Sequence, residues 1–153
     1  MKALVPGALA LLPSYTSIED PVADLRAACL AAAGRLGPRV RVVASTATGG
    51  SGARVGAALV AAVGAEVVES GETGVLVVGN GSAKRTEKAP GHLDGRAAAF
   101  DDALRADFAA DPVLAGELWA DTACLTELPP LAEAEVLYDA APFGVQYWVA
   151  VWA

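Results

Sequence analysis

The chain has 153 residues, 54% of them hydrophobic, and its formal net charge is −7. This length and apolar content predict one folded domain over residues 1–153 and exclude a disordered chain. The acidic balance argues against a nucleic-acid-binding protein, because phosphate contacts need a basic surface. No apolar segment reaches the roughly 20 residues that a membrane-spanning helix needs, so we also expect no membrane partner.

The two cysteines, Cys29 and Cys124, lie far apart in the sequence and form no CxxC pair. We expect free thiols in a reducing cytoplasm, with a disulfide between them as the alternative. The chain starts with a lysine and an apolar run, as a signal peptide does. However, Pro6 interrupts that run and no small-x-small cleavage site follows it, so the sequence favours a cytoplasmic location over secretion.

The first half of the chain alternates short β-branched runs with segments of helical periodicity, as α/β proteins do. Asp20-Pro21 indicates a helix start, with Asp as N-cap and Pro at the first helical position. Residues 53–65 have little polarity, which predicts a helix buried on nearly all sides. The elements expected in this half are a strand at 2–5, a helix from Asp20-Pro21 to Gly37-Pro38, a strand at 39–45, the helix at 53–65, a short strand at 66–69 and a strand at 74–79.

We expect the sheet to be organised around the strand at 74–79. It contains four consecutive apolar residues, Val75-Leu76-Val77-Val78, three of them β-branched. Such a run is typical of a strand that is covered on both faces in a parallel sheet. Leu76 and Val77 should therefore be nearly fully buried.

The second half predicts helices followed by a final strand. Asp94 is a candidate N-cap for a helix whose buried face is marked by Ala97, Phe100, Leu104 and Phe108. Asp111-Pro112 predicts another helix start. The remaining elements are a short helix at Leu131–Tyr138, a turn at 139–144 and a strand at 145–152 that is apolar on both faces and should lie inside the sheet.

A polar loop at residues 79–94 connects the central strand to the next helix. In open α/β sheets, ligands lie beyond the carboxyl ends of the strands, and loops of about 15 residues are often functional. The candidate ligand-binding residues are Asn80, Ser82, Lys84, Arg85, Lys88 and His92. Their cationic members predict a small anionic partner that carries a carboxylate or phosphate group.

The alternative interpretation of this loop is a solvated connection in which Arg85 and Lys88 pair with Glu87 or Asp94. The two interpretations differ in what they predict for stability. Exposed charges contribute little to folding, so under the ligand-binding interpretation Arg85→Ala should leave the melting temperature nearly unchanged. Under the alternative, the same change should lower it.

Three segments carry a resemblance to a known family: ALVPGALALLP near the start, VVGNGSAKRTEKAPGHLD in the middle and EVLYDAAPFGVQYWVAVW at the end. They resemble a short actinobacterial branch of the class III extradiol dioxygenase superfamily, typified by the catalytic subunit of protocatechuate 4,5-dioxygenase. The resemblance implies a three-layer α/β/α sandwich around a mixed, mostly parallel sheet of about five strands. That architecture agrees with the α/β elements expected from the residues themselves.

The chemistry of that superfamily does not carry over to this chain. Its members hold non-haem Fe(II) with two His and a carboxylate, and use a further His as acid/base. The first ligand would follow the first strand, where this chain reads Val5-Pro6-Gly7-Ala8. Because His92 is the only histidine, we expect no metal site within one chain and no cofactor.

Three functions stay open at this point. The first is a metal-free protein that keeps the superfamily's cleft and binds a small anionic molecule at residues 79–94. The second is a structural or interaction protein, in which the loop and the apolar last strand serve self-association or docking to a partner enzyme. The third is a metal enzyme whose site is completed between subunits. The sequence leaves open both catalysis and assembly into a homo-oligomer.

Overall fold

The computed structural model describes residues 1–13, 22–47 and 49–153, and over these residues it shows one mixed sheet of six strands. The strands are β1 (Lys2–Val5), β2 (Arg39–Val43), β3 (Glu66–Val67), β4 (Gly74–Val78), β5 (Glu135–Ala140) and β6 (Tyr147–Trp152). Their order across the sheet is β3-β2-β4-β1-β6-β5. The first four of these pair in parallel, whereas β6 and β5 pair antiparallel. The mixed, mostly parallel sheet is confirmed, with one strand more than expected.

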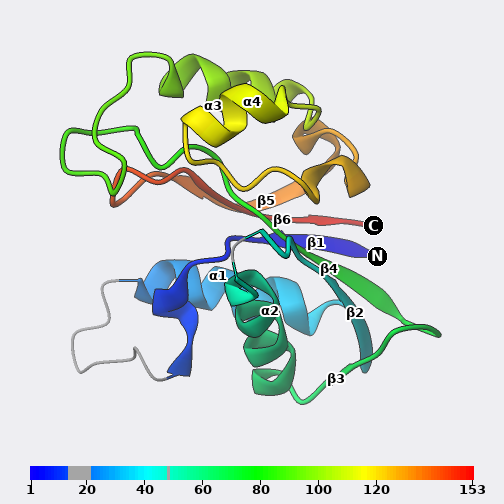
Figure 1. The fold of residues 1–153 in the computed structure, drawn as a ribbon. Helices are drawn as coiled ribbons and strands as arrows, with labels where there is room; N and C mark the ends of the chain where they lie inside the picture. The colour runs from blue at the N-terminus through cyan, green and yellow to red at the C-terminus, as the bar shows by residue number, and fades with distance from the viewer. Residues whose placement is uncertain (14–21, 48) are drawn as a thin grey trace.

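Helices cover both faces of this sheet (Figure 1). On one face lie α1 (Ala23–Gly34) and α2 (Ser51–Ala62), and on the other lie α3 (Ala97–Ala106) and α4 (Pro112–Glu117). Three short 3-10 helices complete the described part: η1 (Leu9–Leu11), η3 (Leu125–Glu127) and η4 (Leu131–Glu133). The three-layer α/β/α sandwich is confirmed, because helices cover both faces of the sheet.

No helix within the described ranges is both long and apolar enough to cross a membrane.

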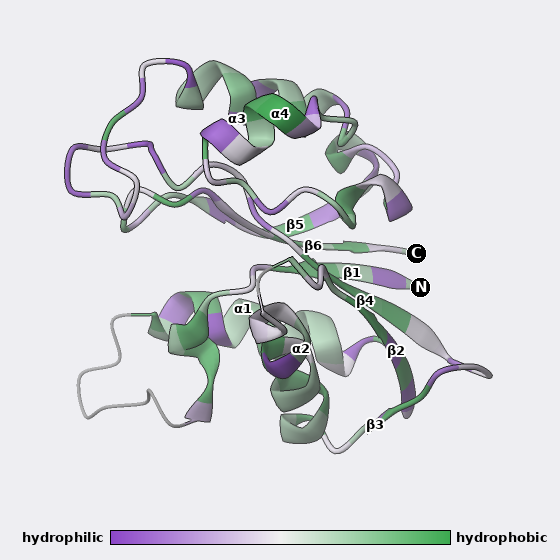
Figure 2. Ribbon diagram, in the orientation of Figure 1, coloured by the Kyte–Doolittle hydropathy of each residue, from purple (hydrophilic) through white to green (hydrophobic). Residues whose placement is uncertain are grey.

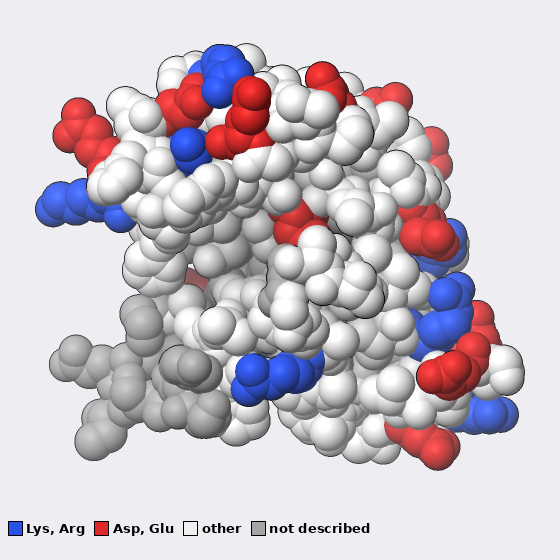
Figure 3. All heavy atoms as spheres, in the orientation of Figure 1, with Lys and Arg blue, Asp and Glu red and all other residues white. Residues whose placement is uncertain are grey.

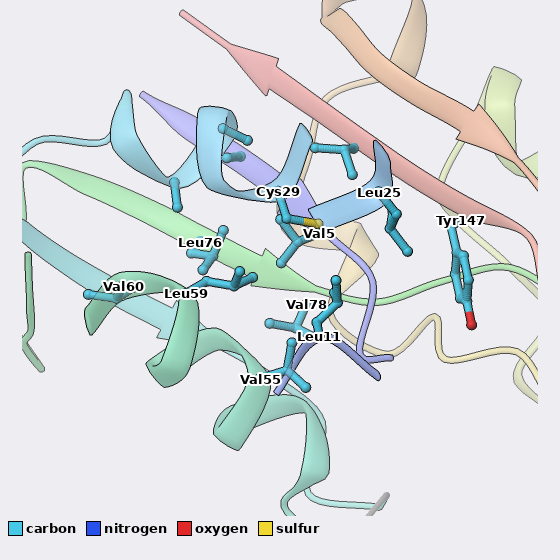
Figure 4. Packing of buried hydrophobic residues seen from close by; sticks show 14 of the residues in the cluster. Val5, Leu11, Leu25, Cys29, Val55, Leu59, Val60, Leu76, Val78 and Tyr147 are labelled. Carbon is cyan, nitrogen blue, oxygen red and sulfur yellow. The ribbon is translucent and has the colours of Figure 1, made fainter. Parts of the chain in front are cut away.

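The central position of β4 is also confirmed. It lies between β2 and β1, and both Leu76 and Val77 are 0% exposed. Neighbouring side chains of a strand point to opposite faces. Leu76 therefore joins the cluster under α1 and α2, and Val77 the cluster under α3 and α4. Figure 4 shows the first cluster, with Leu76 on β4, Cys29 on α1 and Leu59 on α2.

The last strand is buried as the sequence predicts. Every residue of β6 is buried, and the strand lies between β1 and β5. Trp148 is fully buried under the α3 layer, where the ring of Phe108 packs edge-on against the rings of Trp148 and Trp152 at 6.2 Å. Edge-to-face contact at this distance is favourable between aromatic rings. The second core cluster is therefore built largely on β6.

The helix expected at Leu131–Tyr138 is wrong. The chain makes only the single turn η4 there and then enters β5. Residues 131–135 are good helix formers, but Val136, Leu137 and Tyr138 have β propensity. Once β6 lies beside β1, its other edge needs a hydrogen-bonding partner, and β5 supplies it. Tertiary pairing thus overrides the local preference.

Within this chain, the helix expected at 53–65 is not buried on nearly all sides. The helix α2 begins at Ser51, and its residues Ala53, Arg54, Ala57, Ala61 and Ala62 are exposed. Alanine counts as apolar in a sequence pattern, yet its methyl group presents little area to water. A face made of alanines can therefore lie in solvent at little cost, because burial energy scales with apolar area.

Helix starts follow the expected capping residues only in part. Asp111 caps α4, and its carboxylate accepts a hydrogen bond from the Val113 N–H at 2.9 Å. The N-cap position of α3 is Arg96, so the expectation for Asp94 is wrong by two residues. Asp94 instead accepts from the Arg96 N–H at 2.9 Å, just before the helix. Asp20-Pro21 lies outside the described residues.

Candidate ligand-binding site

The loop at residues 79–94 leaves the carboxyl end of β4 and runs beside the turn between β5 and β6 (Figure 1). It is mostly hydrophilic in Figure 2, in contrast to the strands that it follows. Main-chain hydrogen bonds attach it to the segment before β6: the Gly81 N–H donates to the Gln146 carbonyl at 2.9 Å, and the Arg85 N–H to the Gly144 carbonyl at 3.0 Å. The loop is therefore a fixed part of the fold.

The start of this loop is a topological switch point of the sheet. The strands β1 and β4 are parallel neighbours, but after β1 the chain passes to α1 on one face and after β4 to α3 on the other. Ligands in open α/β sheets bind where such connections diverge. In Figure 3 the surface is hollowed between the two layers on the side toward which these strands run.

Two of the sequence candidates, Ser82 and Arg85, belong to a buried polar network. Ser82 and Asp101 are 0% exposed, and Gln146 is 1% exposed. The Asp101 carboxylate accepts from the Ser82 N–H at 2.8 Å and from the Arg85 guanidinium at 3.1 Å. The same guanidinium nitrogen donates to the Gln146 Oε1 at 2.9 Å, and the Ser82 hydroxyl donates to the Leu118 carbonyl at 2.8 Å. These contacts hold the loop on α3 and β6.

The network extends from the buried Asp101 to the surface. Burial raises the pKa of Asp101, an effect that the hydrogen bonds from the loop oppose. The Gln146 amide donates to Asp139 at 2.7 Å, and Asp139 in turn accepts from Arg105 at 2.7 and 3.0 Å. The hydrogen bond from Arg105 is the main cause that lowers the pKa of Asp139. Loop, helix α3 and hairpin β5–β6 are thus joined by charge-assisted hydrogen bonds.

Asn80 and Lys84 lie at the base of the loop. Asn80 lies two residues beyond the end of β4, where its main chain pairs with that of Asp121 in both directions at 3.0 Å. The Lys84 ammonium lies 5.6 Å from the centre of the Trp119 ring, within cation–π distance. Both side chains are partly accessible and available for contact with a small molecule.

Lys88 and His92 lie further out and are exposed. His92 has a left-handed backbone with φ of 59°, and its Nδ1 is 3.4 Å from the Glu87 carbonyl oxygen. No ion pair joins Lys88 to any other described residue, whereas Arg96 pairs with both Asp94 and Glu117. The pairing of Lys88 with Glu87 or Asp94 that the sequence left open is absent from the described residues.

Lys88 lines a pocket of about 520 Å³ together with Thr86, Glu87, Pro142 and Phe143. The aromatic ring of Phe143, on the turn before β6, is 46% exposed. Sequence reasoning missed Pro142 and Phe143 because it treated residues 139–144 only as a turn. The available signal was an aromatic residue between a proline and a glycine in a predicted turn. The pocket combines one cation, one carboxylate, one hydroxyl and an apolar wall.

The turn and the loop fit together tightly at Gly144. Its φ is 76°, a conformation that side-chain-bearing residues rarely adopt. A Cβ atom there would lie 2.4 Å from the Ala89 Cβ and 2.6 Å from the Thr86 Oγ1. Glycine is required at this position, and its presence lets Phe143 reach the wall of the Lys88 pocket.

The residues of the switch point do not fit the iron site of the extradiol dioxygenases. Among the described residues, no group of three or more His, Cys, Asp or Glu is placed to hold a metal ion. The segment after β1 contains Pro6 and Gly7, and His92 is exposed on the outer loop. Both cysteines are free, and burial raises the pKa of Cys29 to about 12, so its thiol stays protonated.

We expect the purified protein to contain no stoichiometric iron or zinc. A stable zinc or iron site needs several N, S or O ligands that converge on one point, and one histidine with two separated cysteines does not provide them. Elemental analysis by mass spectrometry checks this expectation. About one tightly held transition metal per chain would contradict it and would favour a site completed between subunits.

Comparison of the chain with protein-family models, with curated proteins and with solved structures gives no match. The description of the site therefore depends on the geometry of this chain alone.

Proposed function

We propose that the protein binds a small organic anion at the 79–94 loop without a metal ion, in the pocket that Lys88 shares with Phe143. The observation that carries this proposal is that Lys88 lines that pocket and forms an ion pair with no described residue. The arginines near it are already engaged, Arg85 with Asp101 and Arg96 with Asp94 and Glu117. A ligand carboxylate or phosphate in this pocket would therefore pair with Lys88.

The pocket favours an anion with an apolar or aromatic body. Phe143 and Pro142 form an apolar wall, and Thr86 adds a hydroxyl group beside Lys88. Small-molecule sites are mostly apolar, with a few polar groups that orient the ligand, and a volume of about 520 Å³ lies in their usual range. An aromatic carboxylate, with its ring on Phe143 and its carboxylate on Lys88, fits this arrangement.

Lys88→Ala should weaken the binding of an aromatic carboxylate by roughly 10- to 100-fold, because it removes a charge-assisted hydrogen bond. The probe is benzoate, with benzamide as its uncharged counterpart, and affinity is measured by calorimetric titration. Because Lys88 is exposed, the melting temperature of the variant should stay close to that of the wild type.

Arg54→Ala is the matched control. It removes an exposed cation from α2, outside the Lys88 pocket, and should leave benzoate binding unchanged. The proposal fails if Lys88→Ala binds benzoate as tightly as the wild type does. It fails also if the wild type binds benzamide as well as benzoate, since the charge would then play no part.

Self-association is a second candidate function, favoured by apolar side chains on the same loop and turn. Leu93 is 56% exposed and Phe143 is 46% exposed. If these residues form a contact between copies, sedimentation should show a dimer that Leu93→Ser dissociates. Benzoate should then change the oligomeric state of neither the wild type nor the variant.

We further propose a cytoplasmic location, supported by the two free thiols. We also propose kinship with the class III extradiol dioxygenases, supported by the three-layer sandwich.

A further inference from the structure

A second pocket lies beyond the carboxyl end of β2 and shares no residue with the Lys88 pocket. Its volume is about 460 Å³. Ser45 lines it from the segment after β2, and Trp119, Asp121 and Thr122 line it from the segment after α4. The other described residues of its wall are small or apolar, so Asp121 is the one charged residue among them.

The main chain holds Asp121 in a fixed position. Its N–H and carbonyl pair with those of Asn80, which places it beside the end of β4. Gly79 permits this close approach, because a Cβ atom there would lie 2.8 Å from the Asp121 carbonyl oxygen. Asp121 therefore lines the pocket from a segment whose main chain is held in place.

The carboxyl group of Asp121 has no partner of its own. No hydrogen bond or ion pair joins it to another described residue, and burial alone raises its pKa. The titratable groups around it do not compensate its charge. The nearby Cys124 thiol is neutral, because burial and the charge of Asp121 both raise its pKa. The Lys84 ammonium lies over the Trp119 ring and forms no ion pair with Asp121. A cation in the pocket would supply the missing counter-charge.

Trp119 adds an aromatic wall to this pocket. Its side chain is 56% exposed, and its ring lies 5.6 Å from the Lys84 ammonium. Its backbone is left-handed, with φ of 57°, which is unfavourable for a bulky residue. Strained residues of this kind often cluster at functional sites, and an aromatic face favours an ammonium group.

We propose that this second pocket binds a small organic ammonium ion, with Asp121 as its counter-ion and Trp119 as its aromatic wall. Oxygen acceptors near the carboxylate, such as the Thr122 hydroxyl, can take further N–H donors of the ligand. The net charge of −7 draws cations toward the protein as a whole. This site does not depend on the anion site at Lys88.

The test uses benzylammonium at neutral pH, with benzyl alcohol as the uncharged counterpart of nearly the same shape. Calorimetric titration should show that the wild type binds benzylammonium at least tenfold more tightly than benzyl alcohol. Asp121→Asn should remove that preference. Asparagine lacks the ring but readily adopts a left-handed backbone. Trp119→Asn should therefore weaken the binding of benzylammonium several-fold.

Controls separate lost binding from lost folding. A raised pKa means that ionisation of Asp121 opposes folding. The cost is absent below the ordinary pKa of 3.8 and is fully present once the pH has risen through the higher folded-state pKa. Asp121→Asn should therefore melt at or above the wild-type temperature at neutral pH. Glu133→Gln removes an exposed carboxylate outside the pocket and should leave binding unchanged. Lys88→Ala should also bind benzylammonium normally, whether or not the anion proposal holds.

The proposal is overturned if Asp121→Asn binds benzylammonium as tightly as the wild type. It is overturned equally if benzyl alcohol matches benzylammonium, or if millimolar benzylammonium gives no heat of binding to the wild type. If Asp121→Asn does not fold, Trp119→Asn decides the test. The proposal is overturned if that variant binds benzylammonium as tightly as the wild type does.

Discussion

Arg85→Ala should lower the free energy of unfolding by about 3 kcal/mol, the lower end of the range for breaking a buried ion pair. The Arg85 side chain is 25% exposed, but its partner Asp101 is fully buried. Without the guanidinium, the Asp101 carboxyl keeps, among the described residues, only the hydrogen bond from the Ser82 N–H, and it must either stay charged without its ion-pair partner or take up a proton. The Gln146 Oε1 loses a donor in the same step. The expected loss differs from the small effect predicted under the ligand-binding interpretation of Arg85. It agrees in direction with the alternative interpretation, except that the partner is Asp101 and not Glu87 or Asp94.

Urea denaturation followed by tryptophan fluorescence measures this loss, and Lys84→Ala is the matched control. Lys84 is the neighbouring cation, but its side chain makes a cation–π contact with Trp119, which is worth about 0.5–1 kcal/mol at an exposed site. In an Asp101→Asn background, Arg85→Ala should cost at least about 1 kcal/mol less, because contacting residues are energetically coupled. Equal losses in both backgrounds, or a loss as small as that of Lys84→Ala, would show that the pair does not anchor the loop.

Leu76→Ala should destabilise the fold by roughly 2–5 kcal/mol, the usual cost of a cavity at a fully buried leucine. The strand β4 has neighbours on both sides, and Leu76 packs in the cluster that α1 and α2 cover. Neighbouring strands and helices restrict collapse around the missing atoms. Val77→Ala, on the opposite face, should cost somewhat less because a smaller side chain is removed.

Equilibrium unfolding of Leu76→Ala, Val77→Ala and a control on β3 checks this expectation. The control is Val67→Ala, since Val67 lies on the edge strand and is 47% exposed. Its effect should stay below about 1 kcal/mol, within the range of surface substitutions. Losses below about 0.5 kcal/mol for both β4 variants would mean that β4 does not organise the core.

The sequence by itself determined which strands are covered on both faces and where one helix begins. Four apolar residues in β4 and six apolar residues in β6 predict central strands, because a strand with apolar side chains on both faces must be covered on both. Asp111-Pro112 predicts the start of α4 through a hydrogen bond within three residues. These features are local, so the order of residue types is enough to specify them.

Only the tertiary structure decided the pairing of segments that are distant in the chain. Arg85 finds Asp101, sixteen residues away, and not the nearer Glu87 or Asp94. Phe143 reaches the Lys88 pocket only because the hairpin β5–β6 folds back against the loop. Residue patterns record whether a side chain prefers water or burial. The partner that it meets depends on the path of the whole chain, because the sheet brings residues of very different sequence position to the same edge.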